Sequence, residues 1–235
     1  MQPIELSAYI LHKREYRETS YLVDAFSAEM GKVSFIAKGV RSSKHNLKSL
    51  LQPFQPLTLR LQGRHELKNL QDCEANGAAL HLQDKALFSG LYLNELLNRL
   101  LQVDCAMEQV FSDYHHGLQQ LSQQQAIEPI LRLFEFSLLI ELGYGLSFEQ
   151  DMAHGENIDP QSFYQWQDDQ GFVRMAGISQ HKNCFVGAHL LAIAKEDWST
   201  AVLASAKKIS RLVLQPLLGR KPLKSRELFI QGVNL

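Results

Sequence analysis

The chain has 235 residues, a formal net charge of −1 and a hydrophobic content of 45%, which is enough apolar material for one large domain or two small ones. It contains no apolar run of about eighteen residues, as a transmembrane helix would need, and residues 1–10 lack the apolar stretch of a secretory signal. Its three cysteines are far apart and form no CxxC motif, so we expect a soluble intracellular protein without a disulfide framework.

Apolar and polar side chains alternate along much of residues 1–80, which is the pattern of half-buried strands. Val33, Phe35 and Ala37, for example, share one face of a strand, while the residues between them share the other. The pattern predicts strands at residues 6–13, 20–27, 32–38, 54–62 and 66–73. Short strands with one longer connection, between the third and the fourth, predict a small five-stranded barrel of the OB type, although an SH3-like barrel would give much the same pattern.

The hydrophobic period changes to that of a helix at Asp84, which predicts a mainly α-helical remainder. Glycines and prolines interrupt residues 147–186, where two short aromatic runs predict a small β-hairpin, and helix resumes after Gly187. We therefore expect a multidomain protein, with an OB-fold domain over residues 1–80, a mainly α-helical domain over residues 81–235, and an irregular insert within the latter.

Basic residues gather in two blocks of this nearly neutral chain. Residues 32–68 contain eight Lys and Arg against one Glu, a net charge of +7, and residues 207–226 contain seven Lys and Arg and no acid. Residues 81–204 compensate with sixteen Asp and Glu against six Lys and Arg, a net charge of −10. Each block alone suits a solvated face, but two blocks on either side of an acidic middle favour a nucleic-acid ligand, because Lys and Arg neutralise phosphates.

Aromatic rings near these basic residues matter because unpaired bases stack on them. Most rings of the predicted barrel occupy alternating strand positions and are expected in its core. Tyr16 differs, since it lies in a predicted turn between Arg14 and Arg17. It is the best candidate for a ring that stacks on a base.

Arg132 is a polar exception in a predicted helix over residues 128–143 that is apolar nearly all round. A helix of this kind belongs in the centre of a bundle, so the guanidinium needs a partner. One alternative is an ion pair within the helix, with Glu128 or Glu135. The other is an anion clamp beside an apolar pocket.

The sequence carries no motif that predicts catalysis. A GxSxG elbow, a GxxxxGK[ST] phosphate loop, a GxGxxG turn and an HExxH helix are all missing. His181, Cys184 and His189, with His154 upstream, form a weak metal-like pattern, because zinc ligands usually come as closely spaced pairs. We therefore expect no enzymatic activity, no metal and no cofactor.

Several segments in order along nearly the whole chain resemble RecO, a family of bacterial DNA repair and recombination mediators: GKVSFIAKGVRSSKHNL, LQPF, LFSGLYLNELLNRLL, RLFEFSLLIELGYG and KPLKSRELF. The resemblance implies an N-terminal OB domain, a helical domain and no enzymatic activity. It implies binding of single- and double-stranded DNA, annealing of complementary strands, and action with RecR to load RecA onto DNA coated by the single-strand-binding protein SSB. It also implies a cytoplasmic, nucleoid-associated protein.

The resemblance also implies which residues contact DNA and the SSB tail. The DNA-binding candidates are basic residues of the barrel and of the C-terminal segment: Lys32, Lys38, Arg41, Lys44, Lys48, Arg60, Lys221, Lys224 and Arg226. The acidic, phenylalanine-ended tail of SSB needs an apolar slot beside a cation. Arg132 is the candidate cation, and Leu133, Phe134 and Phe136 are the candidate walls.

One departure from the family pattern is clear. Many relatives carry a four-cysteine zinc module in the region of residues 147–186, where this chain has only Cys184, so no zinc is expected. Three other hypotheses remain open: an RNA- or tRNA-binding OB-fold accessory protein, a metal-dependent phosphodiesterase using His181 and His189, and a protein-binding scaffold.

Overall fold

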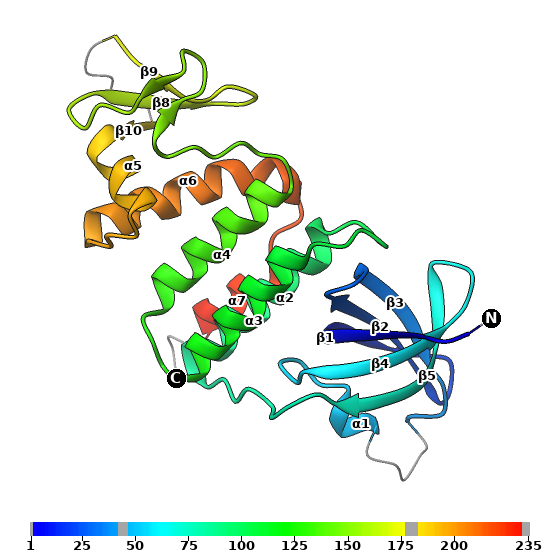
Figure 1. Ribbon diagram of the computed structural model, residues 1–235. Helices are drawn as coiled ribbons and strands as arrows, with labels where there is room; N and C mark the ends of the chain where they lie inside the picture. The colour runs from blue at the N-terminus through cyan, green and yellow to red at the C-terminus, as the bar shows by residue number, and fades with distance from the viewer. Residues whose placement is uncertain (1, 42–46, 177–182, 232–235) are drawn as a thin grey trace. The chain divides into compact units, whose positions relative to one another are not determined.

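The computed structural model describes residues 2–41, 47–176 and 183–231 (Figure 1). Its contacts divide the chain into two compact units. The first, which we call the barrel unit, consists of Met1–Ile127 and Arg220–Leu235. The second, which we call the insert unit, consists of Glu128–Gly219.

The barrel unit begins with a closed five-stranded barrel. Its strands are β1 (Ile4–Tyr16), β2 (Ser20–Ser27), β3 (Gly31–Ala37), β4 (Leu57–Gln62) and β5 (Leu67–Ala75), and a short helix α1 (Leu47–Leu50) precedes β4. The strands neighbour one another in the order β1-β2-β3-β5-β4, and β4 pairs back onto β1. All pairs are antiparallel except β3 with β5. This closed barrel confirms the predicted OB-type fold.

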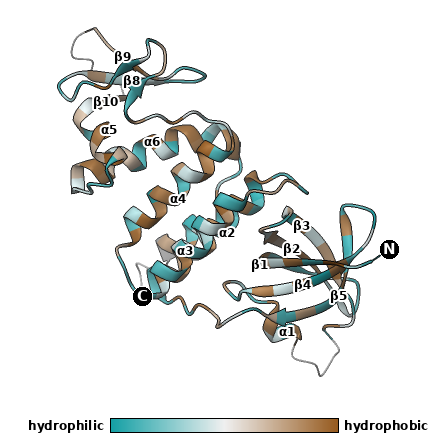
Figure 2. Ribbon diagram, in the orientation of Figure 1, coloured by the Kyte–Doolittle hydropathy of each residue, from teal (hydrophilic) through white to brown (hydrophobic). Residues whose placement is uncertain are grey.

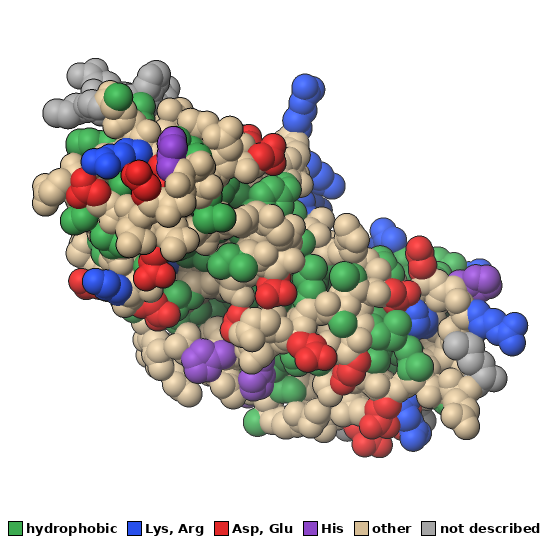
Figure 3. Space-filling view, turned by 45° about the horizontal axis from the view of Figure 1, so that its top comes forward, with side chains coloured by type: hydrophobic (Ala, Val, Ile, Leu, Met, Phe, Trp, Pro, Cys, Tyr) green, Lys and Arg blue, Asp and Glu red, His purple; other side chains and the backbone are tan. Residues whose placement is uncertain are grey.

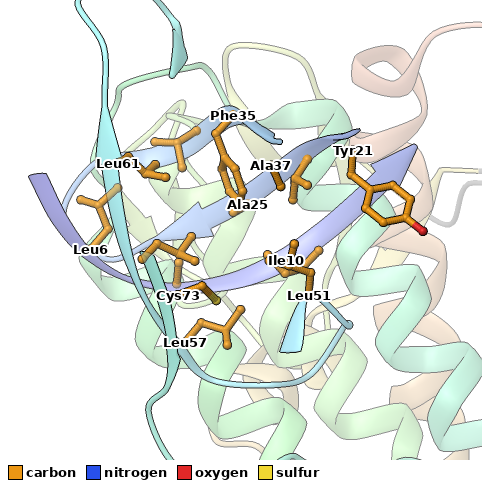
Figure 4. Close-up of a cluster of buried hydrophobic side chains, with 14 of the residues drawn as sticks. Leu6, Ile10, Tyr21, Ala25, Phe35, Ala37, Leu51, Leu57, Leu61 and Cys73 are labelled. Atoms are coloured by element: carbon orange, nitrogen blue, oxygen red, sulfur yellow. The ribbon is translucent and has the colours of Figure 1, made fainter. Parts of the chain in front are cut away.

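The barrel core follows from the alternation in the sequence. Val33, Phe35 and Ala37 are fully buried on one face of β3, as are Leu59 and Leu61 on β4. Figure 4 shows these rows of side chains meeting inside the barrel. Hydropathy accordingly alternates along the strands (Figure 2).

Gly31 shows how closely the helical part approaches the barrel. It is the first residue of β3, directly after the turn from β2, with a φ of +66°, and a Cβ placed on it would be 1.9 Å from the carbonyl oxygen of Cys105. Only glycine fits this backbone, both because of its conformation and because of the contact.

Three helices complete the barrel unit: α2 (Asp84–Leu100), α3 (Glu108–Ser122) and α7 (Lys224–Gln231). Helix α3 covers the outer face of β1 and β2, where the Tyr9 ring lies 5.2 Å from that of Tyr114 and the Phe26 ring 5.3 Å from that of Phe111. Burial raises the pKa of Tyr9 to about 12, so its hydroxyl stays neutral at this interface. Helix α7 packs against α2, which brings the C-terminal segment back to the barrel unit (Figure 1).

The insert unit combines helices with small sheets. Its elements are α4 (Ile127–Glu141), β6 (Gln150–Asp151), β7 (Glu156–Asn157), β8 (Phe163–Gln167), β9 (Gly171–Arg174), β10 (Cys184–Val186), α5 (Gly187–Ala194) and α6 (Thr200–Leu218). Strands β8 and β9 form the predicted hairpin, and β10 extends it to three strands. The Phe148 ring links α4 to this sheet, lying 4.9 Å from Phe136 and 5.7 Å from Phe172.

The division into units differs from a boundary at residue 80, because α2, α3 and α7 group with the barrel. The predicted OB domain (1–80) and helical domain (81–235) stay a prediction. No helix in the described part of the chain is both long enough and apolar enough to cross a membrane.

Candidate nucleic-acid interface

A β-bulge in β1 determines which side chains of the last residues of this strand face outward. The pairing of β1 with β2 shifts between Ile10 and His12, and a bulge of this kind changes which side chains share a face. Before the shift, Tyr9 points outward under α3. After it, His12 and Arg14 are exposed and Tyr16 is half-buried, each lining a hollow of the outer surface.

The first of these hollows lies where β1, β2 and β3 meet. It has a volume of about 520 Å³, and its walls include Tyr16, Arg17, Ile36 and Lys38. The guanidinium of Arg17 lies 5.2 Å from the centre of the Tyr16 ring. Lys38 is exposed directly after the end of β3. The hollow therefore combines an aromatic ring with two cations and one acid, Glu18. A ring beside cations is the combination that proteins use to bind single-stranded nucleic acid.

A second hollow shares Lys38 with the first. It has a volume of about 360 Å³ and extends to Leu70 and Asp72 on β5. Asp72 also forms an exposed ion pair with Arg60, at 3.0 Å. Lys38 thus stands between two adjoining hollows, and Arg60 lies next to the second one.

Three more cations lie at this end of the barrel. Arg41 braces the β1–β2 turn, because it pairs with Glu15 at 2.9 Å and donates to the carbonyl oxygen of Arg17 at 3.2 Å. The ammonium group of Lys13 donates to the carbonyl oxygen of Leu51 at 2.7 Å. Burial lowers the pKa of Lys13, and the charge of Lys48 lowers it further. Lys48 itself is exposed. Cations thus lie at the same end of the barrel as Lys38, together with the acids Glu15, Glu18 and Asp72.

The other barrel candidates are placed differently. Lys32 lies at the opposite end of β3, where its ammonium group donates to the carbonyl oxygen of Asn98 at the end of α2. It is half-buried and occupied by this contact. Lys44 falls outside the described residues.

The C-terminal candidates lie on the barrel unit. Lys221, Lys224 and Arg226 are all exposed, and the first two line a third hollow together with β1 and α2. Contacts to α2 hold the segment in place: Arg99 donates to the carbonyl oxygen of Lys221 at 2.8 Å, and Glu95 accepts from the backbone N–H of Lys224 at 3.0 Å. The first basic block and the C-terminal part of the second thus lie on the same unit, whereas Lys207, Lys208 and Arg211 lie on the insert unit.

Arg132 is buried in the insert unit. Its guanidinium pairs with Glu135 at 2.6 Å, and the other oxygen of Glu135 accepts from the hydroxyl of Ser210. This confirms the expected ion pair within the helix. The Nε atom of Arg132 has no hydrogen-bond partner among the described residues. Of the candidate walls of a tail slot, Phe134 and Phe136 are buried and Leu133 is half-buried.

The weak metal-like pattern is not assembled by the described residues. His154 pairs with Asp151 at 3.0 Å, and His189 bonds with the hydroxyl of Ser205 at 2.7 Å. No group of three His, Cys, Asp or Glu in the described part of the chain is arranged to hold a metal ion. His181 lies outside that part.

The charge pattern of the sequence predicts no role for Arg14 or Arg17. Their positions on either side of Tyr16, a ring in a predicted turn, are the signal that points to them. On the face shown in Figure 3, Lys and Arg side chains lie around the barrel with acidic side chains among them, so the arrangement of cations matters more than their number.

Proteins with an OB-type barrel form a class in which many members bind single-stranded nucleic acid. Residues 1–78 match the family model described as Recombination protein O N terminal, and residues 83–227 match Recombination protein O C terminal. The chain therefore belongs to the RecO family of DNA repair proteins.

Relatives named DNA repair protein RecO align over nearly the whole chain. That of Pseudoalteromonas atlantica is 46% identical over 227 residues, which cover 97% of this chain and 94% of the relative. That of Glaesserella parasuis is 45% identical, covering 94% and 92%. That of Mannheimia succiniciproducens is 44% identical, covering 95% and 98%. Each of these names describes a DNA repair protein.

Proposed function

We propose that this protein is a non-catalytic recombination mediator of DNA repair. It binds single- and double-stranded DNA, anneals complementary strands, and acts with RecR to load RecA onto SSB-coated DNA at the bacterial nucleoid. The observation that carries the proposal is the hollow beside Lys38, where the Tyr16 ring and the Arg17 guanidinium lie together on an OB-type barrel. Membership of a DNA repair family supports DNA as the ligand.

The geometry suits a strand held by its phosphates with its bases accessible. Lys38 and Arg17 can neutralise phosphates, and phosphate contacts carry no sequence information. Tyr16 offers one stacking surface that accepts any base. Two strands held on a cationic surface repel each other less, so pairing between them meets a lower barrier. Annealing without sequence preference follows from these contacts.

The test uses complementary strands precoated with SSB. Annealing is followed by fluorescence energy transfer between labelled strands, once with intact SSB and once with SSB that lacks its last residues. We expect annealing with intact SSB and a strong reduction without the tail, because tail contacts raise the local concentration of the mediator. Annealing that is independent of the tail would reject recruitment, and absence of annealing in both arms would reject the mediator function.

We propose Arg132 as the contact for the acidic tail. Its unpartnered Nε and its position among apolar side chains support this, although its guanidinium is paired with Glu135. The tail carboxylates must then compete with Glu135. Glu135→Gln should therefore raise the affinity for a tail peptide, and Arg132→Lys should lower it, as measured by fluorescence anisotropy. Unchanged affinity in both variants would place the tail site elsewhere.

The RecR-dependent step is tested by RecA filament formation on SSB-coated DNA. We expect this protein and RecR to be required together, so omission of either should leave RecA excluded. Loading by either protein alone would contradict the proposed division of work.

A further inference from the structure

A third hollow on the barrel unit lies between β1, α2 and the C-terminal segment. Its volume is about 640 Å³, larger than either hollow beside Lys38. Cations reach it from each of these three parts of the chain: Arg14 from β1, Arg99 from α2, and Lys221 and Lys224 from the C-terminal segment. Residues more than a hundred positions apart in the sequence thus line one hollow.

Cations outnumber acids in this hollow. Arg14, Arg99, Lys221 and Lys224 face Glu95 and Glu227, so the lining carries a net charge of +2 with His12 neutral. Glu95 is engaged by the start of α7, where it accepts three hydrogen bonds. Within the described chain, no ion pair or hydrogen bond occupies the charged ends of Arg14, Lys221 and Lys224. The charges of Arg14, Lys221 and Lys224 are therefore available to bind an external anion.

The lining contains no Phe, Tyr or Trp ring, in contrast to the hollow beside Tyr16. A strand with unpaired bases gains affinity from stacking, whereas a duplex keeps its bases inside and offers its phosphates. Cations without a ring therefore match a duplex better than a single strand. Arg14 and Tyr16 lie two residues apart on the same face of β1, about 7 Å along the strand, so the two hollows adjoin.

We propose that the hollow between β1, α2 and the C-terminal segment binds the sugar–phosphate backbone of duplex DNA, next to the single strand held beside Tyr16 and Lys38. This inference rests on the proposed function and divides its DNA contacts into two places. A newly paired duplex then has a phosphate-binding surface directly beside the strand from which it forms.

The test compares duplex and single-strand affinities of the full chain. A labelled duplex and an oligo-dT of equal length are titrated by fluorescence anisotropy at fixed salt. Lys221→Gln/Lys224→Gln should weaken duplex binding about tenfold and oligo-dT binding less than about twofold. Tyr16→Ala should show the reverse preference. Lys85→Gln/Lys195→Gln removes the same charge from exposed positions outside the hollow and should change neither affinity.

Thermal melting serves as the control for folding. The contacts that hold Lys221 and Lys224 to α2 use main-chain atoms, so the double variant should melt at the wild-type temperature. Arg14→Gln, on the opposite wall, should reproduce the duplex-specific loss. Equal losses for both DNAs, or an unchanged duplex affinity, would overturn the inference while leaving DNA binding intact. A wild-type protein that binds neither DNA would overturn the proposed function itself.

Discussion

Helix α4 of the insert unit and the Tyr16 end of the barrel unit place their cations in different ways. On α4, Arg132 is buried and pairs with Glu135 at 2.6 Å. At the Tyr16 end of the barrel, Lys38 is exposed beside two hollows, and no described residue forms an ion pair with it. The comparison shows that the number of cations in a segment says little about binding, because the tertiary neighbours decide which charges remain available.

The largest effect that tests this comparison concerns the buried pair. Arg132→Ala would leave Glu135 buried without its cation, and removal of one partner of a buried pair costs about 3–5 kcal/mol. Urea unfolding should show this loss in the free energy of unfolding. Arg132→Met/Glu135→Leu removes both charges and should recover most of it. A loss below about 1 kcal/mol for Arg132→Ala would contradict a tightly paired interior.

A smaller effect is expected on the barrel unit, in affinity and with no loss of stability. Lys38→Gln/Arg17→Gln removes two exposed cations beside Tyr16 and should weaken oligo-dT binding about 10- to 100-fold. The slope of log affinity against log salt should fall in magnitude by about 1.4, since each single-strand phosphate contact contributes about 0.7. Lys85→Gln/Lys195→Gln is the matched control. An unchanged slope would show that these cations do not contact phosphates.

The smallest effect tests how the C-terminal segment is held on the barrel unit. Burial alone would raise the pKa of Glu95, but hydrogen bonds from Ser225 and Lys224 and the charge of Arg99 outweigh it and lower that pKa. Glu95→Gln should therefore destabilise the protein by about 1–2 kcal/mol near neutral pH. Because the folded-state pKa is depressed, this difference is fully present above the ordinary value of 4.5 and is lost as the pH falls below it.

The measurement is thermal melting of both proteins over a pH series. Wild type and Glu95→Gln should converge in acid, and a constant difference at all pH values would reject the ionised carboxylate as the anchor. Weaker duplex binding by the variant would accompany the loss, because Lys221 and Lys224 depend on this anchor for their position.

The barrel was predictable because its strands are half-buried and alternate in polarity. The spacing of Val33, Phe35 and Ala37 alone predicts the face of the strand that points into the core. The β1 bulge was not predictable, since a shift of register between Ile10 and His12 leaves no residue that marks it. That shift decides that Arg14 and Tyr16 face outward, and so the sequence could suggest Tyr16 without showing what surrounds it.

The candidate site was less predictable for a similar reason. The bond between Arg99 and the carbonyl oxygen of Lys221 joins residues 122 positions apart, and no local pattern reveals such a contact. Lys32 belongs to the same basic block as Lys38, yet it faces α2 at the opposite end of β3. Composition identified the two basic blocks, whereas the grouping of their charges in space required the tertiary fold.

The most direct test of the account is hydrogen–deuterium exchange of the full chain with and without oligo-dT. We expect peptides that cover residues 14–22 and 36–41 to exchange more slowly in the complex, because the strand lies on this end of the barrel. Peptides from residues 128–176 should be unaffected. Protection confined to the insert unit, with the barrel peptides unchanged, would contradict the claim that the free cations of the barrel unit bind DNA.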